Sequence, residues 1–262
     1  MTRIHLFEFN DQPWFPAVFR RMQTDYLQFV TTLGAGHQNL VPLFQRALQH
    51  AGTDEILDLC SGGTGPWLRL QKQLETAGLP VRIRLSDKYP NPEAIRKWGA
   101  APRQGIEYLS EPVDAVHVPP HLKGMRTFFQ GFHHFKPEQA RSILENAVAQ
   151  RTAIGVFEAS LPPRLALLLL LISPATTIAS YILLTPFIKP HAWWRFVWTY
   201  LVPIVPLATC WDGVISLLRV YSVQELRELT ASIDSQDYVW EIGKASTGTP
   251  VFDFTYLVGY PE

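Results

Sequence analysis

The stretch that decides the fold is EILDLCSGGTGPW, residues 55–67. An apolar strand ends in Asp58 and runs into a turn with Gly62, Gly63 and Gly65, after which a helix begins. Glycine lets the backbone turn sharply and approach a ligand closely, and a helix N-terminus offers oriented N–H groups. Dinucleotide-binding turns have the spacing G-x-G-x-x-G without a preceding acid, so a nicotinamide-dependent oxidoreductase is disfavoured. An acid at this place suits a cationic or polyhydroxyl ligand better than a pyrophosphate.

Strand-like and helix-like segments alternate around this stretch. We expect strands at residues 55–60, 81–87, 105–115, 125–135 and 152–160, and helices at 67–78, 92–100, 136–151 and 222–233. Such alternation predicts right-handed crossovers and a mainly parallel sheet. The last two strands, 238–246 and 250–261, are joined by STGT as a hairpin, which adds an antiparallel strand. The expected fold class is α/β, with a mostly parallel seven-stranded sheet that has helices on both faces.

Three regions are expected along the chain. Two helices at residues 13–33 and 40–52 predict an N-terminal helical cap over residues 1–52. Residues 53–160 and 218–262 form the α/β core, and residues 161–217 form a hydrophobic helical insert. The chain has 23 Lys and Arg against 23 Asp and Glu, which argues against a nucleic-acid partner. The two distant cysteines favour a reducing compartment, and the first residues resemble no secretory signal.

Carboxylates follow two more of the expected strands. Asp87 ends the second strand, where an acid can bind the two hydroxyls of a ribose, and Asp114 follows the third. Each of these acids alone is equally well read as a cap or a solvated loop residue. Together with Asp58 they lie at the carboxyl ends of three successive parallel strands, and ligands bind at that edge of an open α/β sheet.

The sequence here resembles the class I S-adenosylmethionine-dependent methyltransferases, over residues 55–160 and again from 222 to the C-terminus. LDLCSGGTG is similar to the family's first glycine motif, with one residue more than its commonest form, D-x-G-x-G-x-G. QGFHHFKPEQARSIL is similar to the end of the family's fourth strand and the helix after it. The resemblance implies a Rossmann-like fold, S-adenosylmethionine as the cofactor and methyl transfer as the activity.

The resemblance also implies roles for single residues. Asp58 and the backbone of the glycine turn would hold the methionine portion, Asp87 the ribose, and Lys88 would flank the adenine. Asp114 and Ala115 would contact the adenine amine, and residues 130–132 would line the methyl-donor side. The complete implied cofactor set is Asp58, Cys60, Ser61, Gly62, Gly63, Thr64, Gly65, Asp87, Lys88, Asp114, Ala115, Gln130, Gly131 and Phe132.

Three residues are candidates for acid–base chemistry. His133 or His134 would deprotonate an acceptor hydroxyl or amine, although a purely structural role is at least as well supported. Asp212 would orient or deprotonate the acceptor, or else Asp212 and Gly213 simply form a turn. Three further residues have a similar status, as anion-binding or strand-capping side chains: Arg219, Tyr221 and Glu158. We expect no metal, because His, Cys and carboxylates do not cluster at ligand spacing.

The insert contains an uncharged stretch, residues 165–188, which as a helix is long enough to cross a bilayer. A second apolar stretch, 196–210, is shorter and contains Pro203 and Pro206. Because the last strands must rejoin the sheet, a single crossing is forbidden, and we expect a hairpin that dips into one leaflet. Its interfacial aromatics would be Trp193, Trp194, Trp198 and Tyr200, with Lys189 and Arg195 meeting lipid phosphates. The alternative is a buried helical pair, or one that seals an oligomer.

These observations predict a methyltransferase at the cytoplasmic face of a membrane, reached through residues 165–210, whose acceptor is a hydrophobic small molecule or lipid. The alternative is a methyltransferase-like lipid-binding or assembly protein without catalysis. No nucleic acid is expected as a partner.

Overall fold

The computed structural model describes residues 3–33, 36–99, 105–161, 166–248 and 252–262. Parts of the predicted segments, such as Ala100, Leu165, Pro250 and Val251, lie outside these ranges. The chain divides into two compact units. The helical unit comprises residues 1–34 and 160–220, and the α/β unit comprises 35–159 and 221–262.

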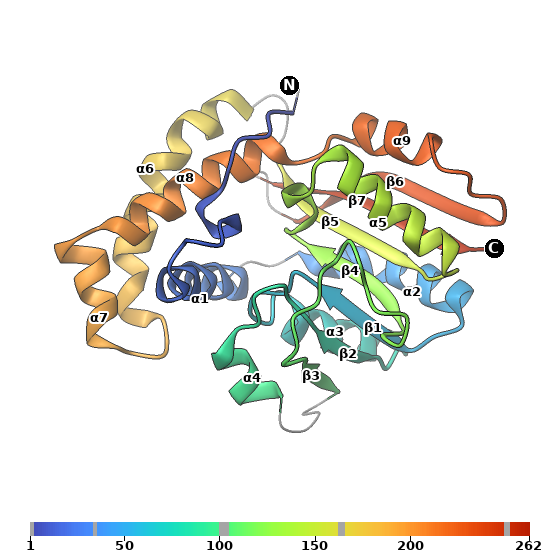
Figure 1. Ribbon diagram of the computed structural model, residues 1–262, viewed down its shortest axis with the longest axis horizontal. Coiled ribbons are helices and arrows are strands. Elements are labelled where there is room, and N and C mark those ends of the chain that lie inside the picture. Colours follow the sequence, from blue (N-terminus) through green and yellow to red (C-terminus); the bar gives the residue numbers. More distant parts are fainter. Residues whose placement is uncertain (1–2, 34–35, 100–104, 162–165, 249–251) are drawn as a thin grey trace. The chain divides into compact units, whose positions relative to one another are not determined.

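The α/β unit is built on a seven-stranded sheet with the order β3-β2-β1-β4-β5-β7-β6 (Figure 1). Adjacent strands from β3 to β5 pair in parallel, and β6 and β7 pair antiparallel. The predicted α/β, Rossmann-like fold class is thereby confirmed, with the closing hairpin in the sheet. The strands are β1 Glu55–Leu59, β2 Arg82–Leu85, β3 Ile106–Tyr108, β4 Met125–Phe129, β5 Ile154–Ser160, β6 Tyr238–Ser246 and β7 Asp253–Pro261.

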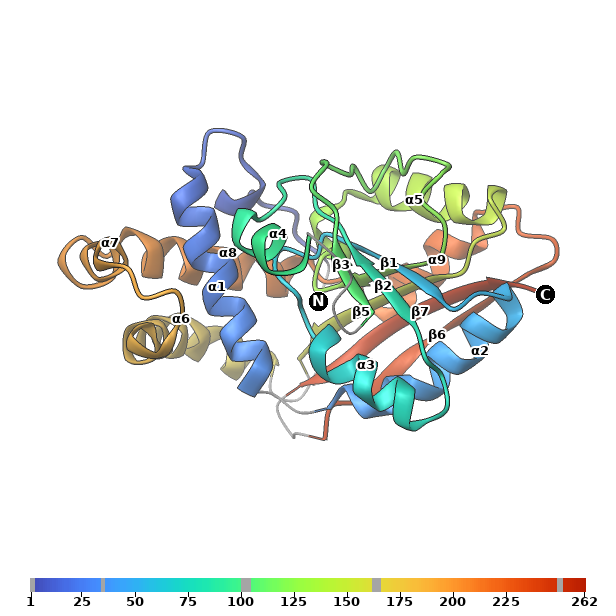
Figure 2. The ribbon, with the colours of Figure 1, turned by 90° about the horizontal axis from the view of Figure 1, so that it is seen from below.

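Helices cover both faces of this sheet (Figure 2). One face carries α2 (Val41–Ala51) and α3 (Trp67–Thr76), and the other carries α5 (Pro137–Ala149) and α9 (Val223–Ala231). The short helix α4 (Pro92–Trp98) starts at Asn91, whose side chain accepts hydrogen bonds from the backbone N–H groups of Glu93 and Ala94. Side chains alternate between the two faces along each strand, so both faces of the central strands are buried.

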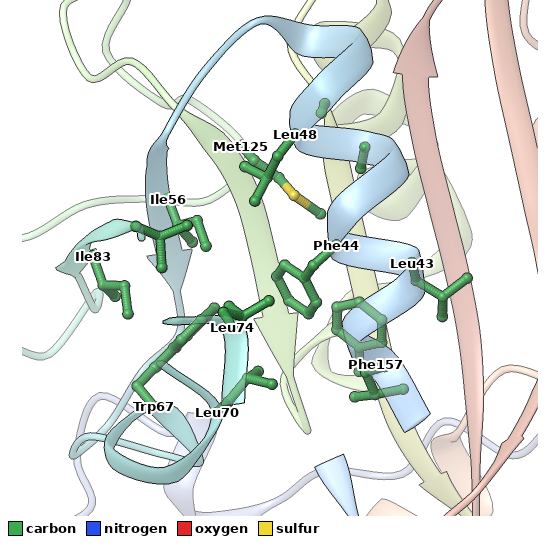
Figure 3. Packing of buried hydrophobic residues seen from close by; sticks show 14 of the residues in the cluster. Leu43, Phe44, Leu48, Ile56, Trp67, Leu70, Leu74, Ile83, Met125 and Phe157 are labelled. Carbon is green, nitrogen blue, oxygen red and sulfur yellow. The ribbon is translucent and has the colours of Figure 1, made fainter. Parts of the chain in front are cut away.

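The core under α2 and α3 combines aromatic rings with leucine, isoleucine and methionine side chains (Figure 3). Phe44 of α2 stacks on Phe157 of β5 with ring centroids 5.2 Å apart, and Trp67 meets Phe44 edge-on at 5.8 Å. All three side chains are fully buried. Burial of each large apolar side chain stabilises the folded state by roughly 1.5–3 kcal/mol. This packing corrects the predicted cap: α2 belongs to the α/β unit, because its apolar face needs the sheet to cover it.

The helical unit contains α1 (Ala17–Leu33), α6 (Ala166–Leu184), α7 (Trp193–Phe196) and α8 (Ile204–Arg219), with a π-helical turn at Val197–Leu201. Helices α6 and α8 pack together as the predicted hairpin. Pro203 lies just before α8 and Pro206 lies in its first turn, where a missing N–H costs nothing. The second apolar stretch, residues 196–210, thus runs into α8, which continues to Arg219.

The apolar side chains of α6 lie mostly outside. Residues Ala166–Phe187 have a mean hydropathy of 2.1 with 6% of an 18-residue window buried, and this helix is long and apolar enough to cross a membrane. The pair Trp193–Leu201 and Ile204–Arg219 also passes that test when taken together, but it is bent by 71°. Large exposed apolar side chains on the insert include Leu171, Leu183, Phe187, Trp193 and Leu201.

One predicted lipid contact is wrong. Arg195 is fully buried, and its Nη2 donates to Asp25 Oδ2 at 2.5 Å, so its charge is neutralised inside the helical unit. Trp194 and Trp198 also pack partly against the interior, beside a small core that includes Tyr181. Of the four aromatics predicted at the surface, Trp193 and Tyr200 are exposed.

Candidate ligand-binding edge of the α/β unit

Asp58 stands at the carboxyl end of β1 and is buried. Its Oδ2 accepts from Ser61 Oγ at 2.6 Å and its Oδ1 accepts from Thr127 Oγ1 of β4 at 2.7 Å. Burial raises the pKa of Asp58 to about 6, although these hydrogen bonds act in the opposite direction. Asp58 therefore ties the glycine turn to β4, and its contact with the methionine portion stays a prediction.

The glycine turn is tied to the acid that ends β2. Gly62 N donates to Asp87 Oδ2 at 2.8 Å, and Tyr89 N donates to Asp87 Oδ1 at 2.8 Å. Ser61 N donates to Ser86 O at 2.9 Å, which continues the β1–β2 pairing beyond the strands. Asp87 is half-buried, so it reaches both the turn and the surface. The predicted meeting of Asp58 and Asp87 around one turn is observed.

The third acid, Asp114, follows β3 in the loop towards β4. Its Oδ2 accepts from Lys88 Nζ at 3.1 Å and its Oδ1 accepts from Val116 N at 3.0 Å. Burial opposes its charge, but these hydrogen bonds and Lys88 outweigh burial and lower the pKa of Asp114. Val113 N donates to Asp87 O at 3.0 Å, so the Asp114 loop lies directly beside the end of β2. The three acids thus follow three neighbouring strands, in the order predicted. Ala115, in contrast, is buried in the core and leaves only its backbone for a ligand.

Backbone strain concentrates at the same edge. Cys60 after β1 has φ +59° and Gln130 after β4 has φ +54°, values that side-chain-bearing residues seldom adopt. Gly131 is needed beside them, because a Cβ there would lie 2.9 Å from Cys60 Cβ. Such strain persists only where the surrounding structure enforces it, and it clusters at binding and catalytic sites. Gln130 is exposed and Cys60 is half-buried, so both strained residues reach the surface.

The residues after Gly131 form a short 3₁₀ turn, Phe132–His134, that is held by Glu158 at the end of β5. Glu158 Oε1 accepts from the backbone N–H groups of Phe132 and His133 at 2.7 and 3.2 Å, and Glu158 Oε2 lies 2.7 Å from His133 Nδ1. Burial raises the pKa of Glu158, but the adjacent His133 and His134 outweigh it, and the net shift is downward. The ring of Phe132, predicted to line the methyl-donor side, is fully buried against Phe128, which leaves its backbone for a ligand.

Asp212 lies in the helical unit, in the middle of α8, so the alternative of a turn at Asp212 and Gly213 is wrong. Its carboxylate accepts from Phe9 N at 2.7 Å, Asn10 N at 3.2 Å and Gln23 Nε2 at 3.0 Å. These bonds are typical of an anchor for the N-terminal segment.

Arg219 has a similar place in the helical unit. It is fully buried, with Nη1 3.0 Å from Glu8 Oε1 and 2.8 Å from Asp11 Oδ2. Its predicted role with an anion therefore has no support in these contacts. Tyr221 belongs to the α/β unit, where its hydroxyl donates to Phe135 O at 2.8 Å.

Two residues of this edge were missed from sequence. Thr127 was read only as part of a strand, yet its hydroxyl is a partner of Asp58. Tyr108, the last residue of β3, donates from its hydroxyl to Gly62 O at 3.1 Å, and burial raises its pKa. The alternation of β3 indicated that Tyr108 faces inward, but nothing local connects it with a turn 46 residues earlier.

No family model matches the chain, and no curated protein matches it. Among solved structures, human N-acetylserotonin methyltransferase in complex with SAM aligns with 96% of this chain at 13% identity and a TM-score of 0.49. PigF with SAH aligns with 95% at 15% identity and a TM-score of 0.49, and the LepI complex with SAM aligns with 80% at 16% identity and a TM-score of 0.44. The alignments cover 59%, 63% and 43% of those chains, so this chain spans less than two thirds of each. The likeness is one of fold.

Proposed function

We propose that the protein is an S-adenosylmethionine-dependent methyltransferase that acts on a hydrophobic small molecule or lipid at a membrane surface. One observation carries the methyltransferase part: Asp58, Asp87 and Asp114 follow neighbouring strands around a glycine turn whose backbone is strained. Negative groups at this edge favour a ligand that combines positive charge with hydroxyl and amine donors. S-adenosylmethionine has all three.

The residues present fit that cofactor. Asp87 is half-buried, and carboxylate oxygens have lone pairs beyond those used by Gly62 N and Tyr89 N, so it can accept from ribose hydroxyls. Lys88 and Asp114 form an exposed ion pair beside it, where the adenine would lie. Asp58 shapes the turn and places a buried carboxyl behind the cationic part. When bound, S-adenosylmethionine supplies a methyl group on a positively charged sulfur.

The chain's own contribution to the reaction would be mainly alignment. Holding donor and acceptor in line within a site that excludes water removes much of the barrier, and a base is needed only if the acceptor carries a proton. For that task we propose the His133–His134 pair. The 2.7 Å contact with Glu158 orients the His133 ring, as a carboxylate does for a basic imidazole elsewhere.

Titration calorimetry with S-adenosylmethionine and S-adenosylhomocysteine tests the cofactor assignment. We expect both to bind, and we expect Asp87→Asn to weaken binding by about tenfold or more, because charge-assisted hydrogen bonds to the ribose are lost. Asp54→Asn is the matched control, since Asp54 lies just before β1 at the opposite edge of the sheet and pairs only at the surface with Arg82. Equal affinity in Asp87→Asn and Asp54→Asn would refute the assignment.

The membrane part of the proposal is supported by the surface of the helical unit. In the uncharged helix α6, 6% of an 18-residue window with mean hydropathy 2.1 is buried, and Trp193 and Leu201 of the insert are each 77% exposed. Exposed apolar surface on this scale is rare in soluble monomers and marks an interaction site. The bent pair α7–α8 suits a segment that enters one leaflet and returns, because the chain must come back to supply β6 and β7.

Flotation with vesicles of phosphatidylcholine and phosphatidylglycerol tests membrane contact. We expect the protein to float with vesicles and the double variant Leu167→Glu/Leu171→Glu to stay behind, because both side chains are more than half exposed on α6. Phe252→Glu, on the α/β unit, is the control. A protein that stays monodisperse as an oligomer without lipid, and does not float, would instead assign this face to contacts between copies.

Turnover to S-adenosylhomocysteine with a lipid extract then tests catalysis. We expect turnover, and a lower kcat with unchanged cofactor affinity in His134→Ala or His133→Ala. No turnover across diverse acceptors, despite cofactor binding, would favour the non-catalytic alternative.

A further inference from the structure

Among the polar side chains of the α/β unit that the proposed function leaves unused, His37 stands out. It begins the short 3₁₀ helix η2 (His37–Leu40), which precedes α2. It is buried, with 8% of its surface exposed, and its Nδ1 has no hydrogen-bond partner among the described residues. A buried polar atom without a partner costs free energy, so it calls for an explanation such as a ligand or water.

The place of His37 is the carboxyl end of the sheet. Its ring centroid lies 6.0 Å from that of Phe129, the last residue of β4, and 5.2 Å from that of Phe254 near the start of β7. Helix η2 also packs against α3, which begins where the glycine turn ends. Phe129 shares a core cluster with Phe157 on the α2 and α3 face of the sheet. His133 lies with Phe132 and Glu158 on the other face, so the two imidazoles flank the ends of β4 and β5.

The backbone around His37 is held by close contacts with the end of β6. Gly36 has φ +123°, and a Cβ there would lie 2.1 Å from Thr247 O, so only glycine permits this approach to the end of β6. Asn39 Nδ2 donates to Ser246 O at 2.7 Å and ties η2 to the same strand end. An imidazole on such a support is held in place before any ligand arrives, which limits the entropy cost of binding.

The charge state of His37 is set by its surroundings. Burial, and then the positive charge of Arg69 on α3, lower its pKa to about 4, so the ring is neutral near pH 7. A neutral imidazole carries one N–H and one lone pair. The ring can therefore donate one hydrogen bond to a ligand without bringing a charge into the core.

S-adenosylmethionine, the proposed methyl donor, carries a carboxylate that the three acids cannot bind. Its methionine part carries an ammonium and a carboxylate, and Asp58, Asp87 and Asp114 can serve only the ammonium and the hydroxyl or amine donors. The cation Lys88 is engaged by Asp114. We infer that His37, beside Arg69 at the start of α3, donates a hydrogen bond to the carboxylate of the methionine part. This inference rests on the proposed function and extends its site to η2.

Two ligands that differ in that carboxylate test the inference by calorimetry. S-adenosylhomocysteine has the complete amino-acid part, and 5′-methylthioadenosine lacks it. We expect His37→Phe, which keeps an aromatic ring, to weaken S-adenosylhomocysteine about tenfold and to leave 5′-methylthioadenosine within about twofold. His37→Gln, which keeps an N–H donor, should recover part of the loss. His50→Phe is the matched control, because His50 lies against Tyr260 at the far end of α2, with ring centroids 4.7 Å apart.

The outcomes separate the two proposals. If the unsubstituted protein binds neither nucleoside, the proposed function fails, and this inference fails with it. If it binds both, and His37→Phe weakens both equally or neither, the proposed function stands and the inference about His37 is overturned. A thermal melt of each variant detects a fold defect, which would weaken both ligands alike and therefore counts against the inference.

Discussion

The two units differ in how much apolar surface they expose, although both bury charged side chains. In the α/β unit, apolar side chains fill two clusters on the faces of the sheet, and the acids gather at the strand ends. In the helical unit, charged groups such as Arg195 and Arg219 are fully buried, while leucines and tryptophans of the insert lie outside. The buried arginines pair with acidic side chains, and contiguous exposed apolar surface of this kind marks an interaction site.

The two units also differ in what their polar side chains do. In the α/β unit, apolar side chains pack the two faces of the sheet, and the acids at the strand ends bind the loops at its carboxyl edge. In the helical unit the buried ion pairs organise the N-terminal segment, since Arg219 pairs with Glu8 and Asp11, and Asp212 holds the backbone of Phe9 and Asn10. Removing one partner of such a pair leaves an uncompensated buried charge.

The largest expected effect follows from that contrast. Arg219→Met should lower the free energy of unfolding by about 3–5 kcal/mol, because Glu8 and Asp11 lose their buried partner. Arg141→Met is the control on the α/β unit, where an exposed i,i+4 pair with Glu145 is worth less than about 0.5 kcal/mol. Chemical denaturation measures both. Similar losses in the two variants would contradict the contrast between the units.

Gly131→Ala should come next. The added methyl would press on Cys60 Cβ at 2.9 Å, in a loop that is already strained, and should cost about 1–3 kcal/mol of unfolding free energy. It should also weaken S-adenosylhomocysteine, because the β1 and β4 ends would separate. A thermal melt and calorimetry measure the two effects. An unchanged affinity would show that this close approach does not shape the site.

The pH dependence of cofactor affinity should be about tenfold per pH unit at most. The pKa of Asp58 in the free protein is about 6, so its carboxyl is charged above that pH and neutral below it. Affinity for the cationic donor should therefore fall as pH drops from 7 to 5. In Asp58→Asn the affinity should be lower at pH 7 and nearly flat over this range. A slope that persists in the variant would assign the effect to another group.

The same raised pKa affects stability. The folded protein binds the Asp58 proton more tightly than the unfolded chain does, so this group's contribution favours folding at low pH and is lost as pH rises through about 6. Asp58→Asn should remove that slope from unfolding curves measured between pH 4 and 7.

The smallest effect is expected for Gly213→Ala. Gly213 lies inside α8, and a Cβ there would meet nothing within 4 Å. The substitution should stabilise the helical unit by roughly 0.5–1 kcal/mol, because alanine has the higher helix propensity. A gain in unfolding free energy for Gly213→Ala and a loss for Gly131→Ala would support the contrast between the two units. A loss in both variants would contradict it.

Much of the α/β unit was predictable from local patterns. The alternation of strands and helices, the closing hairpin and the convergence of three acids all follow from periodicity and from the geometry of parallel sheets. The orientation of Asp58 was not predictable, because its partner Thr127 lies 69 residues away. The interior of the helical unit was predicted least well. Nothing near Arg195 in the sequence indicates Asp25, and nothing near Asp212 indicates the N-terminal segment.

Local sequence patterns were enough to predict the order of the elements, the glycine turn after β1 and the acids at the strand ends. These depend on side-chain periodicity and on the few residues that a turn accepts, and both are local properties. Contacts between distant residues place α2 on the sheet and turn Asp58 inward. They also join Asp212 and Arg219 to the N-terminal segment and bring His37 to the end of β4. The physical reason is that burial and hydrogen-bond partners come from residues far apart in the chain, which meet only when it folds.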